Sequence, residues 1–120
     1  MANEITVTVS LGVVNGNLRD SFAPGALQFT QAAVGGPYPG YQTIGTTEET
    51  VPTTEITTLG WAVFRNLDVT NYIEIGFSTG VYGIRLEAGE VAVFRLNPGA
   101  TIYAKANTAA CKLLAKVYQD

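Results

Sequence analysis

The sequence predicts an all-β protein, specifically an antiparallel β-sandwich of the jelly-roll type. From Gly60 to Asp120, short runs of β-branched, aromatic and aliphatic residues are separated by Gly, Pro, Asn and Asp. Within these runs apolar and polar residues alternate, which is typical of half-buried strands. The 120 residues are enough for one sandwich domain over positions 1–120 with a sizeable core.

The first strand is predicted from a clean alternation over Glu4 to Leu11, which places four aliphatic side chains on one face. Asn15-Gly16-Asn17 then predicts a tight turn. After a break at Pro24-Gly25, a second inward face is expected to run from Leu27 to Ala33.

Residues 34–58 have a different composition, rich in Gly, Pro and Thr. Short strands are compatible with residues 41–46 and 50–56. We expect the whole segment to be an excursion over the surface, because long loops of this kind are usually functional or disordered. Its candidate interface residues are Tyr38 and Tyr41, with Pro37 and Pro39 as stiffening neighbours.

The second half returns to alternation, and each strand is predicted to place a set of apolar residues on one face. These sets are Ala62 and Phe64; Ile73, Ile75 and Phe77; Tyr82, Ile84 and Leu86; Ala92, Phe94 and Leu96; Ile102, Ala104 and Ala106; and Cys111, Leu113, Ala115 and Val117. A turn at Asn107-Thr108 separates the last two strands. The tetrapeptide Ala-Val-Phe-Arg occurs at 62–65 and again at 92–95, which indicates two strands with similar environments.

Composition favours assembly with other chains. Only 14% of the residues are charged, against about 25% in soluble proteins, so part of the surface is expected to be covered; a neutral, Thr-rich surface is the alternative. The net charge is −3 and the seven basic residues form no run, so nucleic-acid binding is not expected. No membrane span or secretory signal is predicted, and folding in a cytoplasm is expected.

The residues needed for common catalytic chemistry are missing or isolated. The chain has no histidine, which removes a Ser/His hydrolase and the commonest metal ligand. The single cysteine, Cys111, is predicted to be buried and inert. Glu48 and Glu49 should point to opposite sides, and Asp68 is predicted to form an Asx turn. We therefore expect no enzyme activity, no cofactor and no metal site.

The chain resembles small structural proteins of tailed-bacteriophage virions. The resemblance is carried by ITVTVSLGVVNGNLRDSF (5–22), QTIGTTEETV (42–51), RNLDVTNYIEIG (65–76), EAGEVAVFRLNPGATIYAKANTAA (87–110) and the terminal strand. It implies a β-sandwich subunit present in many copies in the virion and assembled in the host cytoplasm, with no active site.

Within the virion, the resemblance favours a capsid decoration (cement) protein. It implies a homo-oligomer, with a trimer as the expected state, that contacts the major capsid protein or another virion protein. Two alternatives stay open. One is a tail or baseplate subunit, and the other is a carbohydrate- or receptor-binding module that uses aromatic side chains on a sandwich face.

Overall fold

The structure is a computed structural model and describes residues 2–120. The described chain is all-β and contains ten strands and no helix. Its contacts divide it into two compact units, one ending at Ala32 and the other spanning Ala33–Asp120. The strands are β1 (Ile5–Asn15), β2 (Leu18–Phe29), β3 (Tyr38–Ile44), β4 (Glu49–Val51), β5 (Leu59–Asn66), β6 (Ile73–Gly76), β7 (Ile84–Leu86), β8 (Val91–Arg95), β9 (Ile102–Ala106) and β10 (Cys111–Gln119).

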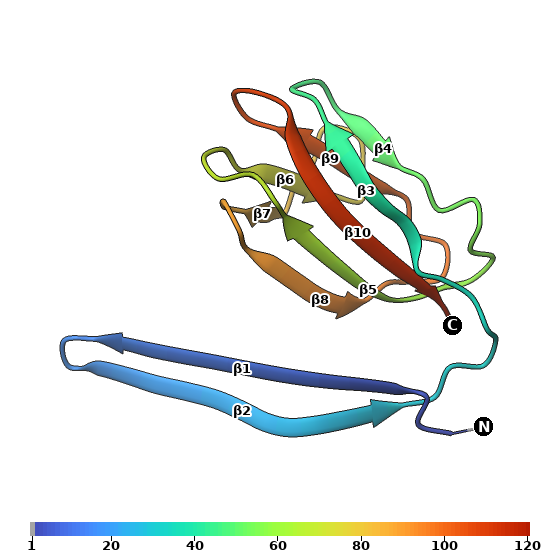
Figure 1. Ribbon diagram of the computed structural model, residues 1–120, viewed down its shortest axis with the longest axis horizontal. Coiled ribbons are helices and arrows are strands. Elements are labelled where there is room, and N and C mark those ends of the chain that lie inside the picture. The colour runs from blue at the N-terminus through green and yellow to red at the C-terminus, as the bar shows by residue number, and fades with distance from the viewer. Residues whose placement is uncertain (1) are drawn as a thin grey trace. The chain divides into compact units, whose positions relative to one another are not determined.

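The first unit is a long antiparallel hairpin of β1 and β2 (Figure 1). Its turn follows the predicted Asn15-Gly16-Asn17, with Gly16 at a positive φ of 57°. The pairing shifts register between Val9 and Leu11, so that Val9 pairs with Gly25 and Leu11 with Phe22. The extra residue lies in β2 beside Pro24, which cannot donate to a ladder and is typical of a bulge.

The second unit holds the other eight strands in two antiparallel four-stranded sheets that face each other (Figure 1). One sheet has the order β3-β10-β5-β8 and the other β4-β9-β6-β7. The predicted β-sandwich is therefore confirmed, and its strands all lie between Tyr38 and Gln119. The strands pair outside-in along the chain, β3 with β10, β4 with β9, β5 with β8, and β6 with β7.

The two short strands expected within residues 34–58 are present, as β3 and β4, with somewhat different bounds. Each of these strands lies at an edge of its sheet. Edge strands tolerate proline, since the missing N–H falls on the unpaired side. The Pro and Gly residues that suggested a loop are thus compatible with edge strands.

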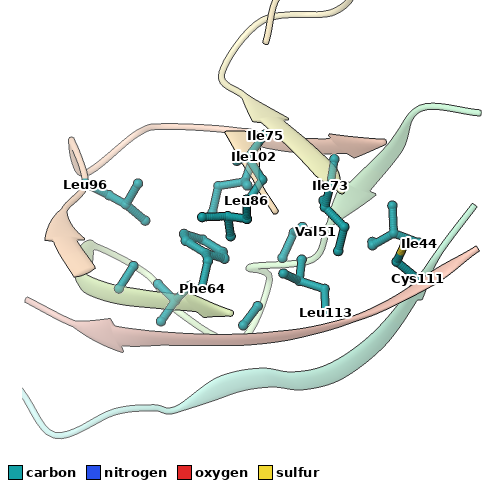
Figure 2. Close-up of a cluster of buried hydrophobic side chains, with 14 of the residues drawn as sticks. Ile44, Val51, Phe64, Ile73, Ile75, Leu86, Leu96, Ile102, Cys111 and Leu113 are labelled. Carbon is teal, nitrogen blue, oxygen red and sulfur yellow. The ribbon is translucent and has the colours of Figure 1, made fainter. Parts of the chain in front are cut away.

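The core lies between the two sheets and is filled by the side chains that alternation placed inward (Figure 2). Phe64 and Leu113 from one sheet meet Ile73, Ile75 and Ile102 from the other, and all five are fully buried. The repeated Ala-Val-Phe-Arg segments pair with each other across β5 and β8. Their register sets each alanine opposite a phenylalanine of the partner strand.

Two predictions of inward-facing residues are wrong. The face expected from Leu27 to Ala33 is not formed, because β2 ends at Phe29, Leu27 is 41% exposed and Ala33 is exposed. Phe77 was expected to share the inward face of Ile73 and Ile75, but β6 ends at Gly76 and the Phe77 side chain is 45% exposed. The alternation of apolar and polar residues continues in the sequence beyond Gly76. The backbone there is no longer a strand of this sheet, so the pattern does not place Phe77 in the core.

Asn66 is the buried polar side chain of the core, and its amide is satisfied. Its Nδ2 donates to the carbonyl oxygens of Asn71 at 2.8 Å and Leu86 at 3.0 Å, and its Oδ1 accepts from the amide of Asp68 at 2.9 Å. Asn66 therefore ties together the turn after β5 and the end of β7.

The register of β10 gives a direct test of the core. Replacing Leu113 by Ala should reduce the free energy of unfolding by about 2–5 kcal/mol, because a fully buried leucine leaves a cavity. The neighbouring Leu114→Ala is the matched control and should cost under about 1 kcal/mol, since the Leu114 side chain points out of the sandwich. Urea denaturation measures both, and equal losses would contradict the register.

Candidate interaction surfaces

Strand β3 carries the interface residues predicted from the sequence. Tyr38 and Tyr41 lie on this edge strand but on opposite faces, because their separation of three residues is odd. Tyr41 points outward and is 70% exposed, while Tyr38 begins the strand and is 41% exposed. Pro39 pairs with Lys116 of β10, and Pro37 is exposed just before the strand. The structure therefore does not bring the two tyrosines together.

The residues just before β3 pack closely on β10. Gly36 has a φ of +94°, and a Cβ added there would lie 2.5 Å from the carbonyl oxygen of Val117. Only glycine combines this backbone conformation with such a close approach. The amide of Gln119 donates to the carbonyl oxygen of Gly35 at 3.1 Å, so the entry to β3 is held against the end of β10.

The outer face of the β3-β10-β5-β8 sheet is unusual in charge, and we call it the basic sheet face. Four of the seven basic residues of the chain point out from it, because they occupy outward positions on three adjacent strands. Aromatic and aliphatic side chains occupy most of the remaining outward positions. The basic sheet face comprises Pro39, Tyr41, Thr43, Trp61, Val63, Arg65, Val91, Val93, Arg95, Lys112, Leu114, Lys116 and Tyr118.

Cations and aromatic rings are neighbours on the basic sheet face. The Lys112 ammonium lies 6.0 Å from the centre of the Tyr41 ring, and the Arg95 guanidinium lies 5.6 Å from the centre of the Trp61 ring. Such pairs are attractive at these distances. Arg95 also forms an ion pair with Asp120 at 3.0 Å.

The hairpin has one apolar and one polar face. Cross-strand register places five apolar side chains of β1 and four of β2 on the same side. These are Ile5, Val7, Val9, Leu11, Val13, Leu18, Phe22, Leu27 and Phe29, and we call them the hairpin apolar face. Leu11 is 61% exposed and Phe22 58% exposed. The other side is mostly polar, although it includes Val14 near the turn.

A cleft of about 570 Å³ opens at the edge of the sandwich near β7 and β8. Phe77, Ile84 and Phe94 line it, together with the turn at Asn97 and Gly99. Phe77 stands edge-on to Phe94, with ring centres 6.3 Å apart. Most of the lining side chains are apolar, and Arg95 and Asn97 are the polar ones.

The adjacent carboxylates Glu48 and Glu49 do not converge, as predicted. Glu49 accepts a hydrogen bond from the amide of Gly45, while Glu48 accepts from the amide of Gly80 at 2.8 Å and from the hydroxyl of Tyr82. The hydrogen bond from Tyr82 lowers the pKa of Glu48, and the Gly80 amide adds to this effect. The same bond raises the pKa of Tyr82 to about 12.

Two further predictions from the sequence are confirmed. Cys111 is 1% exposed, and burial raises the pKa of its thiol, with the nearby charge of Asp68 acting in the same direction. The Asp68 carboxylate accepts hydrogen bonds from the amides of Asn71 at 2.6 Å and Thr70 at 3.0 Å, which forms the expected Asx turn. These bonds lower the pKa of Asp68.

The basic sheet face was missed because the basic residues are scattered along the sequence. A signal was nevertheless present, since Arg65, Arg95, Lys112 and Lys116 all stand one position away from an inward apolar residue. That parity predicts an outward direction for each. It does not predict that β5, β8 and β10 lie side by side.

The Glu48–Tyr82 bond predicts a late ionisation of Tyr82. Its folded pKa is raised above the usual value near 10, so its contribution to stability is complete below pH 10 and is lost as the pH rises through about 12. In the difference between ultraviolet titrations of the wild type and Tyr82→Phe, ionisation should occur near pH 12. Glu48→Gln should move it toward 10, and a Tyr82 that already ionises near 10 in the wild type would contradict the bond.

The stability contributed by Glu48 depends on pH in the opposite direction to that of Tyr82. Its folded pKa is lowered, so its contribution is present above the usual carboxyl pKa and disappears as the pH falls through the lowered value.

Among the described residues, no group of three or more His, Cys, Asp or Glu side chains is arranged to hold a metal ion. No helix with the length and apolar character of a membrane span occurs in residues 2–120. Comparison with known proteins gave no significant match to any family model, curated protein or solved structure.

Proposed function

We propose that this chain is a non-enzymatic structural subunit of a tailed-bacteriophage virion, and that within the virion it is a capsid decoration (cement) protein. It would stabilise the shell through contacts with copies of itself and with the major capsid protein or another virion protein. The virion assignment comes from the resemblance of the sequence to structural proteins of tailed phages. The observation that carries an assembly role is the hairpin apolar face.

An isolated two-stranded hairpin is at best marginally stable in water. This hairpin has strands of 11 and 12 residues, with nine apolar side chains on one side. Five of these side chains, Val9, Leu11, Leu18, Phe22 and Leu27, are 40–61% exposed, so two such faces packed together would remove apolar surface from water. Contact with a second copy would therefore both order the hairpin and join the subunits.

The strand order supports the finer assignment of the sandwich as a jelly roll. In such a fold a long antiparallel pair is rolled up, so that the first strand pairs with the last, the second with the second to last, and so on. The four outside-in pairs from β3–β10 to β6–β7 follow this scheme. Jelly rolls are frequent in viral capsid proteins and lectins, which is compatible with the virion role and with the second candidate below.

The homo-oligomer is proposed to have closed symmetry, with three copies as the resemblance to decoration proteins implies. Tyr38, Tyr41, Pro37 and Pro39 remain proposed interface residues on edge strand β3. Because the two tyrosines point to opposite faces, they would contact different neighbours. A tail or baseplate subunit would use the same surfaces, and the location of the chain in the particle separates that alternative.

A carbohydrate- or receptor-binding module is the second candidate, and the cleft beside β8 favours it. Its volume of about 570 Å³ lies in the range of ligand sites. The Phe77 and Phe94 rings could stack on a sugar while Asn97, which also lines the cleft, supplies hydrogen bonds. A glycan array separates the two functions, since a decoration subunit should give no specific glycan signal and a receptor-binding module should give one that Phe77→Ala removes.

The assembly role predicts that the double variant Leu11→Ser/Phe22→Ser is monomeric at micromolar concentration, whereas the wild type sediments as an oligomer. Both side chains lie on the hairpin apolar face, so serine removes the apolar area that contact would bury. Val14→Ser is the matched control, because Val14 is 75% exposed on the opposite face and should leave the mass unchanged. Sedimentation velocity measures the mass, and particle occupancy should fall in parallel. A double variant that assembles like the wild type would refute the role of the hairpin.

A further inference from the structure

The basic sheet face concentrates positive charge in an acidic protein. The chain has ten carboxylates and seven basic residues, yet four of those basic residues point from one face of one sheet. Asp120 accompanies them at one end, where it pairs with Arg95. Charges placed at random in a chain with surplus carboxylates would be expected to meet more acidic neighbours.

Three cations of this face have no carboxylate partner. Within residues 2–120, Arg65, Lys112 and Lys116 have no carboxylate oxygen within 4.0 Å. Arg65 instead donates from Nε to the carbonyl oxygen of Gly89 at 3.2 Å, and the guanidinium carries further N–H donors beyond this one. None of these three cations is therefore paired with a carboxylate of the described chain.

In the other sheet, a carboxylate lies between two cations on adjacent strands. Lys105 of β9 and Arg85 of β7 are both cross-strand neighbours of Glu74 in β6. Arg85 also lies 3.6 Å from a carboxylate oxygen of Glu87. Opposite charges on adjacent strands are the usual way in which a sheet surface is neutralised. The cations of the other sheet thus have Glu74 as a cross-strand neighbour, whereas no cross-strand neighbour of a cation on the basic sheet face is a carboxylate.

The centre of the basic sheet face is apolar rather than polar. Leu114 and Val63 are half-buried at its middle, and Val93 beside them is 41% exposed. Tyr41, Trp61 and Tyr118 surround this centre. Aromatic residues and arginine around an apolar centre are enriched at protein–protein interfaces.

A nucleic acid fits this surface less well. Phosphate contacts dominate nucleic-acid binding and require many cations, whereas only four basic side chains point out from this face. The aliphatic side chains at the centre would also gain little from phosphates or riboses. A protein surface can complement both the cations and the apolar centre of this face, because it can offer carboxylates to the first and apolar side chains to the second.

We propose that the basic sheet face is a docking surface for a protein that presents carboxylates around an apolar centre. This inference rests on the proposed assembly role and adds the chemistry of the partner, which for a decoration protein is the shell. The charge complementarity of Arg65, Lys112 and Lys116 with such a surface carries the proposal. Electrostatic attraction would speed docking, and burial of the centre would hold it.

A glutamate–tyrosine copolymer is a suitable probe, because it combines carboxylates with apolar rings. The purified full-length wild type should bind it more tightly than it binds polyglutamate, and binding should weaken as salt is raised. A thymidine oligonucleotide of matched charge should bind less tightly than the copolymer. Biolayer interferometry measures all three affinities.

The decisive comparison uses two pairs of substitutions that remove the same charge. Lys112→Gln/Lys116→Gln should weaken copolymer binding by about tenfold, a change of about 1.4 kcal/mol. Arg85→Gln/Lys105→Gln on the other sheet is the matched control and should leave the affinity unchanged. Equal losses in both pairs, no binding by the wild type, or tighter binding of the oligonucleotide would overturn the proposal.

This test is independent of the hairpin. Leu11→Ser/Phe22→Ser should still bind the copolymer, because neither residue belongs to the basic sheet face. If the hairpin variants assemble like the wild type while the copolymer result holds, the proposed assembly through the hairpin fails and the docking surface stands. If the copolymer result fails and the hairpin result holds, the reverse is true.

Discussion

The register of β10 between β3 and β5 is the constraint on which most of this structure depends. Strand β10 is nine residues long and pairs with both neighbours. In this register Cys111, Leu113, Ala115 and Val117 fill the core, and Lys112 and Lys116 point outward. Because side chains alternate with a period of two, a slip of one residue would bury both lysines and expose the core. The hydrophobic core and the basic sheet face are thus set by the same pairing.

The apolar surfaces of this protein are of two kinds, which differ in how far they are buried. The core between the sheets is complete, since its largest side chains are fully buried. The hairpin apolar face is not covered to the same degree, and Leu11 and Phe22 are more than half exposed. A low content of charged residues, 14%, is consistent with a chain that uses much of its surface in contacts. The proposed assembly role would account for a complete core beside the exposed Leu11 and Phe22.

The sequence predicts the strands well where alternation and turn residues agree. The last two strands, the Asn107-Thr108 turn between them, the burial of Cys111 and the Asx turn at Asp68 all follow from local patterns. The bounds of the two strands within residues 34–58 did not follow from the sequence, because Pro39 and the glycines are as compatible with an edge strand as with a loop. Phe77 was misplaced because the pattern does not mark where β6 ends.

The basic sheet face could not be predicted because it depends on which strands are neighbours. Outward directions for Arg65 and Lys116 follow from parity, but their proximity requires β5 to pair with β10, two strands far apart in the sequence. The hairpin apolar face shows a related limit of sequence-based prediction. Its alternation predicts a strand with one apolar face, but a local pattern does not identify what covers that face.

A reconstruction of the purified particle by electron cryo-microscopy tests the central claim most directly. The account predicts many symmetry-related copies of this chain on the shell, with hairpins in contact between copies and the outer face of the β3-β10-β5-β8 sheet against an acidic part of the shell protein. A particle that lacks this chain, or one in which that sheet face and the hairpin apolar face are both open to solvent, would contradict the account.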